Sequence, residues 1–271
     1  MARTGSMNWW GKIIGGAFGF MLGGPLGALF GAVIGHNFDV GMQATGGSRS
    51  AEWGRQERVQ TAFFTATFSL LGHLCKVDGR VSEEEIAITR QVMARMDLTA
   101  AQRQAAMALF AAGKKDGFPV IDVLRQLKQE IGRQASLQRM FIEIQLYAAY
   151  ADGVLHQSEQ QVLQNICAVL GVRKGDYEAL AATIGGEMHH RQSAGPARTT
   201  GISLQDAYAV LNLTPDATDA EVKKSYRRLM NQHHPDKLVS KGLPEEMIKI
   251  ATQRTHEIRQ AYEKLKAARN F

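Results

Sequence analysis

The chain has 271 residues, enough for about two domains of roughly 150 residues each. Hydrophobic residues make up 45% of it, which excludes a disordered chain, and its two cysteines exclude a disulfide scaffold or a multi-cysteine zinc site. The net charge of +6 divides into +2 for residues 1–50, −1 for 51–190, +2 for 191–202 and +3 for 203–271. No region is a strongly basic block, so we predict no nucleic-acid partner.

An uncharged run of 23 residues extends from Ile13 to Gly35. As a helix it would be roughly 34 Å long, enough to cross a hydrocarbon core of about 30 Å. We therefore predict a single transmembrane helix, preceded by a short tail of residues 1–12. Trp9 and Trp10 stand where an interfacial aromatic belt is expected. A cleaved signal peptide and a soluble glycine-rich tail are the alternatives, but the run is longer than the apolar part of a signal peptide.

Glycine recurs at every fourth position of this run, which would leave one helix face without side chains. Such a face lets a second helix approach closely inside a bilayer. We therefore predict two partners for this segment, namely membrane lipid and a second copy of the chain in a homodimer. The stripe consists of Gly15, Gly19, Gly23, Gly27 and Gly31, and it continues to Gly35.

The middle of the chain has helical periodicity. Residues 36–55 are rich in small and polar residues, and we expect them to form a juxtamembrane linker. Over residues 56–188 the apolar residues recur at helical spacing, without the alternation typical of strands. The pattern predicts a compact all-α domain of about seven helices. A second linker is expected over residues 189–202.

A short motif occurs twice in this domain, 74 residues apart and each time between two apolar helices. Asp78 and Glu85 belong to the first copy, and Asp152 and Glu159 belong to the second. Four carboxylates would suit a hard cation, so these residues are candidate metal ligands. An EF-hand, however, needs further ligands at alternate loop positions, and neither copy has them.

The other interpretation of the motif is a pair of helix caps. Ser82 with Glu85, and Ser158 with Gln161, have the spacing of capping boxes. We favour caps over a metal site and predict no bound metal and no cofactor. The repeated motif resembles the TerB-like domain of tellurite-resistance proteins, which implies an all-helical fold.

The spacing of apolar residues over 203–271 predicts three further helices. The second begins at Thr218 or Asp219, runs to about Gln232, and has one apolar and one cationic face. Like charges at i and i+4 destabilise an isolated helix, so we interpret the cationic face as a docking surface for an acidic partner. A merely solvated face is the alternative. The cationic residues are Lys223, Lys224, Arg227 and Arg228.

The tripeptide His234, Pro235 and Asp236 follows this helix. Pro235 disfavours helical dihedrals at His234, which ends the helix and stiffens the loop. Asp236 provides a carboxylate for a charge-assisted hydrogen bond to an arginine of a partner. A metal or acid–base cluster at this place is the alternative, but the sequence offers no nucleophile for it.

The order and spacing of the basic helix, the HPD tripeptide and the third helix resemble the J-domain of the DnaJ co-chaperones. The resemblance implies a DnaK-type partner that itself contains the catalytic groups, so we do not expect this chain to be an enzyme. The resemblance implies that DnaK is bound by Lys223, Lys224, Tyr226, Arg227, Arg228, His234, Pro235 and Asp236.

The whole layout resembles the DjlA family of membrane-anchored, DnaJ-like bacterial co-chaperones. The resemblance implies a single-pass inner-membrane protein with a periplasmic N-terminus, a TerB-like middle domain and a cytoplasmic J-domain. It also implies stimulation of the DnaK ATPase, dimerisation through the membrane helix, and a role in envelope and capsule signalling. A metal- or stress-sensing membrane scaffold that acts through the middle domain is the alternative.

Overall fold

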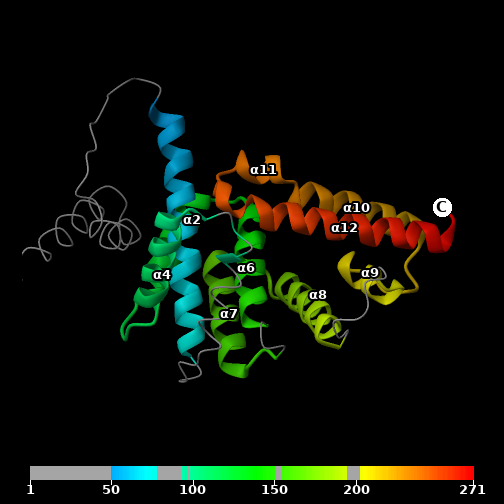
Figure 1. The fold of residues 1–271 in the computed structure, drawn as a ribbon, viewed down its shortest axis with the longest axis horizontal. Coiled ribbons are helices and arrows are strands. Elements are labelled where there is room, and N and C mark those ends of the chain that lie inside the picture. The colour runs from blue at the N-terminus through cyan, green and yellow to red at the C-terminus, as the bar shows by residue number, and fades with distance from the viewer. Residues whose placement is uncertain (1–49, 78–92, 95, 97, 151–153, 194–201) are drawn as a thin grey trace, which may run out of the picture.

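The computed structural model describes residues 50–77, 93–94, 96, 98–150, 154–193 and 202–271. Every regular element in these ranges is a helix, in agreement with the predicted all-α class (Figure 1). None of the described helices is both long and apolar enough to cross a membrane. The predicted span at residues 13–35, with its glycine stripe, lies outside the described residues, as do Asp78, Glu85 and Asp152.

The middle domain is built around α6, which is buried along most of its length. Phe141 of α6 meets Phe63 edge to face, with 5.6 Å between the ring centroids. The end helices are longer than the sequence suggested, because α2 begins inside the predicted first linker and α8 continues into the second. The described helices are α2 (Ser50–Lys76), α4 (Ala100–Gly113), α5 (Val120–Ile131), α6 (Ala135–Ala149), α7 (Gln157–Leu170) and α8 (Lys174–Ser193).

Two glycines allow α2 and α4 to pack backbone against backbone. A Cβ atom on Gly72 would lie 2.0 Å from the carbonyl oxygen of Phe110, and one on Gly113 would lie 1.8 Å from that of Ser69. Both distances are far shorter than a van der Waals contact. The close crossing of these helices therefore requires glycine at both positions.

The cap of α7 differs from the prediction. His156 is the N-cap, and its backbone N–H donates a hydrogen bond to the Glu159 carboxylate at 3.0 Å. The predicted pairing of Ser158 with Gln161 is wrong, because His156 already has extended dihedrals and the helix begins at Gln157. Glu159, one of the four candidate metal ligands, thus caps a helix N-terminus, where a negative charge is also favourable.

The C-terminal unit contains two long helices that lie side by side, α10 and α12 (Figure 1). Of the two predicted alternatives, Thr218 and not Asp219 caps α10, because its hydroxyl accepts a hydrogen bond from the Glu221 N–H while the Glu221 carboxylate accepts one from the Thr218 N–H. The described elements are α9 (Leu204–Val210), α10 (Asp219–His233), α11 (Pro235–Val239), the 3-10 helix η1 (Glu245–Met247) and α12 (Ile248–Arg269).

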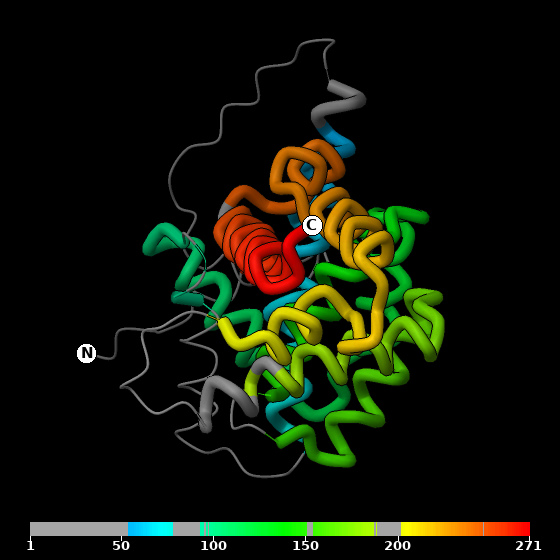
Figure 2. Tube along the Cα trace, turned by 90° about the vertical axis from the view of Figure 1, so that its right-hand side faces the viewer, coloured from blue at the N-terminus to red at the C-terminus, as the bar shows by residue number. Residues whose placement is uncertain are grey.

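The C-terminal unit packs directly on the middle domain, which the sequence did not predict. Leu238, Leu243 and Met247 are fully buried in the core of the middle domain, not in the separate core formed by α9, α10 and α12. Gly242, at φ +99°, brings the backbone so close to α2 that a Cβ atom would lie 2.5 Å from Val59 Cγ1. Figure 2 looks along α10 and α12 and shows the middle-domain helices beside them.

Candidate partner-binding site

The HPD turn joins α10 to α11. His234 has φ −60° and ψ 122°, and Pro235 is the first residue of α11, so the predicted break of the helix at His234 is confirmed. The side chain of Asp236 is 91% exposed and that of His234 is 46% exposed, with 3.9 Å between His234 Nδ1 and Asp236 Oδ2. The turn therefore presents an imidazole and a carboxylate next to each other at the surface.

Three of the four cations of α10 are exposed to solvent: Lys224, Arg227 and Arg228. Arg228 Nη2 also donates a hydrogen bond to Ser225 Oγ at 3.2 Å, which holds part of its guanidinium near the helix. Among the described residues, none covers these three side chains, so an acidic surface could approach them directly.

Lys223 and Tyr226 lie differently from the other predicted contact residues. The ring of Tyr226 stacks on that of Tyr262 in α12, with 4.1 Å between the centroids. Lys223 Nζ lies 4.8 Å from the centroid of the Phe271 ring. Both side chains are half-buried and hold α10 against α12 and the chain end.

Arg269, which the sequence analysis did not single out, fixes the start of α10. Its guanidinium donates hydrogen bonds to the Tyr208 hydroxyl (2.7 Å), the Ala217 carbonyl (2.6 Å), the Asp219 carboxylate (3.0 Å) and the Pro215 carbonyl (2.9 Å). These bonds join the end of α12 to α9, to the start of α10 and to the segment between them. The orientation of the cationic helix is thereby set by the C-terminus of the chain.

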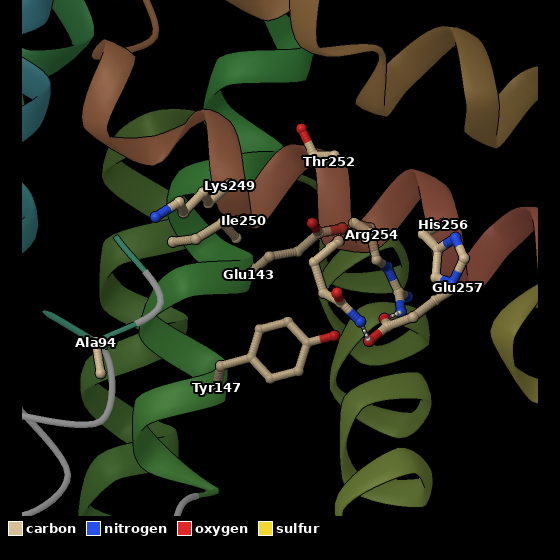
Figure 3. Close-up of a pocket in the computed structure, with 10 residues that line it drawn as sticks. Ala94, Glu143, Tyr147, Lys249, Ile250, Thr252, Arg254, His256 and Glu257 are labelled. Atoms are coloured by element: carbon tan, nitrogen blue, oxygen red, sulfur yellow. Dashed lines mark hydrogen bonds and ion pairs between the residues drawn. The ribbon is translucent and has the colours of Figure 1, made fainter. Parts of the chain in front are cut away.

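A buried charge cluster lies between the two domains and includes His233, the residue before the HPD tripeptide. Figure 3 shows two of its members, Glu143 of α6 and Arg254 of α12. Glu143 of α6 accepts a hydrogen bond from Arg139 Nε at 3.0 Å, and its second oxygen lies 3.5 Å from Nδ1 of His233. Arg254 of α12 is 4% exposed and pairs with Glu257 at 3.2 Å. A middle-domain carboxylate thus contacts the residue that directly precedes the HPD tripeptide.

Burial and charge decide the protonation states in this cluster. Burial has the largest effect on His233 and, together with the arginines, lowers its pKa to about 4, against the opposing effect of Glu143. Burial alone would raise the pKa of Glu143, but its positive neighbours outweigh this and hold the pKa below its usual value. At neutral pH the contact therefore joins a neutral imidazole to a carboxylate that the arginines compensate.

A sequence signal for this cluster existed. Glu143 stands between Ile142 and Ile144 in the most apolar stretch of the middle domain, where an unpaired carboxylate would be costly. Such a residue indicates a buried partner, although the sequence does not say which one. Among the described residues, no group of three His, Cys, Asp or Glu could hold a metal ion.

A capped α9, a cationic α10, an exposed HPD turn and a long antiparallel α12 together define a J-domain. In agreement, the family model of the DnaJ domain matches residues 206–270. That of the tellurite resistance protein TerB matches residues 64–182, and that of the co-chaperone DjlA transmembrane domain matches residues 7–50.

Relatives named co-chaperone protein DjlA match over almost the whole chain. The protein of Coxiella burnetii is 44% identical over 98% of this chain and 100% of its own length. Those of Photobacterium profundum and Escherichia coli K12 are each 40% identical, over 97% and 98% of this chain and 99% and 100% of their own lengths. No solved structure matches. The chain belongs to the DjlA co-chaperone family.

Proposed function

We propose that this protein is a membrane-anchored regulatory co-chaperone, which binds a DnaK-type chaperone through its J-domain and stimulates that partner's ATPase. The observation that supports this most directly is the exposed HPD turn at the end of a cationic helix. On this proposal the groups that hydrolyse ATP belong to the partner. The present chain binds the partner and triggers the hydrolysis.

The exposed residues would act in two ways. Lys224, Arg227 and Arg228 attract an acidic surface and orient it along α10, because complementary charge speeds encounter and fixes register. Asp236 and His234 then form hydrogen bonds with the partner from a turn that Pro235 holds in one shape. Because these side chains are already exposed, binding needs no prior opening of the J-domain.

Tyr226 and Lys223, which were also predicted to contact the partner, would act mainly by holding α10 in place. Tyr226 and Lys223 are half-buried against α12 and Phe271, so each offers only part of its surface to a partner. We assign to them the maintenance of the angle between α10 and α12, on which the position of the HPD turn depends.

The proposal is tested by the ATP turnover of DnaK in the presence of the full chain. The His234→Gln variant should lose nearly all stimulation while its helical content stays that of the wild type. His256→Gln is the matched control, because it makes the same change at an exposed histidine of α12 that is not part of the HPD tripeptide. A wild-type chain that leaves the turnover of DnaK unchanged would refute the proposed function.

The N-terminal segment completes the proposal. We infer that residues 13–35 span the inner membrane with the N-terminus in the periplasm, because DnaK and its ATP are cytosolic. The glycine stripe would form a homodimer, and two J-domains at one place on the membrane would raise the local concentration for a partner. A role in envelope or capsule signalling is the process that we propose for this anchored form.

The glycine stripe makes its own prediction. Replacing Gly19, Gly23 and Gly27 by leucine should weaken self-association, because the leucine side chains separate the two helix backbones. Cross-linking of the full chain in membranes measures the dimer, and leucine at Gly16 and Gly24, which lie off the stripe, is the control. Equal dimer yields for the stripe variant and the wild type would show that the stripe has no part in association.

A further inference from the structure

The J-domain and the middle domain present a continuous surface to a partner. Leu238 and Leu243 are buried in the middle-domain core, and His233 contacts Glu143 at the base of the HPD turn. At the rim, Lys241 Nζ donates a hydrogen bond to Ser136 Oγ at 2.7 Å. Because these contacts fix the docking, residues of the middle domain have defined positions relative to α10.

A cavity of about 710 Å³ lies along this seam. Its wall on the middle domain contains three arginines: Arg133 before α6, Arg139 in α6 and Arg173 before α8. Lys241 adds a fourth cation from the J-domain, and Asp176 is the one carboxylate among the described residues that line the cavity. Arg139 is paired with Glu143, and Arg173 lies 3.0 Å from Asp176, so the excess of positive charge comes from Arg133 and Lys241. The Arg173 side chain is 86% exposed, and a surface pair of this kind is weak enough to exchange its carboxylate for one of a partner.

This cationic cavity continues the cationic face of α10. Asn231 and Gln232, in the last turn of α10, line the cavity. They stand four residues after Arg227 and Arg228, and residues four apart lie on the same side of a helix. A partner that lies along Arg227 and Arg228 would therefore meet Arg133 and Arg173 at the end of the helix.

We propose that the middle domain extends the partner-binding surface of the J-domain, and that Arg133 and Arg173 bind acidic groups of the same DnaK-type chaperone. This inference rests on the proposed function and adds a second domain to the interface. The two arginines do not touch the HPD tripeptide, so their contribution is to encounter and affinity and not to the triggering of ATP hydrolysis. Electrostatic attraction of this kind is strongest at low salt.

The experiment measures DnaK ATP turnover against the concentration of the full chain, reconstituted in nanodiscs. The test variant is Arg133→Glu/Arg173→Glu. Arg103→Glu/Arg125→Glu is the matched control, because it makes the same change in charge on α4 and α5 of the same domain. Circular dichroism and thermal melting of each variant establish that it is folded.

At low salt, we expect the concentration of the test variant that gives half-maximal stimulation to be at least roughly fivefold higher than that of the wild type. The maximal stimulation should be unchanged. The difference should shrink as salt rises, and the control should follow the wild type. Two outcomes overturn the inference: equal half-maximal concentrations for test and control variants, or a lower maximum at an unchanged half-maximal concentration. Failure of the proposed function is a separate result, because there the wild-type chain would show no stimulation.

Discussion

At the scale of single residues, the contact between Glu143 and His233 connects the middle domain to the HPD turn. Both side chains are almost completely buried, and they come from different domains. A buried carboxylate is tolerated only when it is paired, and here Arg139 and Arg254 supply the compensating charge. The contact between the two domains therefore includes buried ionisable groups as well as apolar side chains.

The lowered pKa of His233 predicts a dependence of stability on pH. The imidazole has a pKa of 6.5 in the unfolded chain and of about 4 in the folded one, so the unfolded chain binds a proton first as pH falls. Its contribution to stability is complete above about pH 6.5 and is lost toward pH 4. We expect the free energy of unfolding to fall by about 2 kcal/mol between pH 7 and pH 5 from this group.

Urea unfolding of residues 50–271 at several pH values measures this loss. The His233→Leu variant has no titrating group at that position and should lose less stability over the same interval. If wild type and variant have parallel pH profiles, His233 is not the group responsible.

At the scale of elements, the segment between α11 and α12 is a docking element. Leu238 at the end of α11, and Leu243 and Met247 within the segment, are buried in the middle-domain core, and Gly242 places the backbone against Val59. This role was not predicted from the sequence. Its docking role depends on which surface lies opposite, and no local pattern contains that information.

Gly242→Ala should weaken the docking. The new Cβ atom would collide with Val59 at 2.5 Å, and φ +99° is itself unfavourable for alanine, so we expect a loss of about 2–4 kcal/mol. Gly117→Ala is the matched control, since Gly117 has φ +72° but a Cβ atom there would have no neighbour within 4 Å, and it reports the backbone strain alone. Thermal or urea unfolding of the two variants gives the difference, and equal losses would argue against a collision with α2.

At the scale of the whole molecule, the middle domain and the C-terminal unit share a core and should lose structure together. The C-terminal unit also has a core of its own, in which Leu229 is fully buried, whereas Leu243 belongs to the core of the middle domain. A substitution of Leu229 therefore tests the stability of the C-terminal unit itself, whereas a substitution of Leu243 tests the contact between the two domains.

Leu243→Ala should cost about 2–4 kcal/mol, because it leaves a cavity in a closed core. We expect amide hydrogen exchange to become faster in α2 and α6 as well as in α12. Leu229→Ala is the comparison, and its effect should centre on α9, α10 and α12. If exchange in α2 is as slow in Leu243→Ala as in the wild type, the domains unfold independently.

The sequence by itself determined the helical class, the end of α10 at His234 and the family, because each follows from local pattern or from motifs in fixed order. It narrowed the cap of α10 to Thr218 or Asp219, and the structure decided for Thr218. The cap of α7 was misplaced by two residues, because two overlapping capping patterns compete and only the backbone decides between them. The pairing of Glu143 with His233, the anchoring by Arg269 and the docking of Leu243 were decided by the tertiary structure alone. Each joins residues 50 or more positions apart, and such contacts depend on how whole helices pack and not on the periodicity of any one of them.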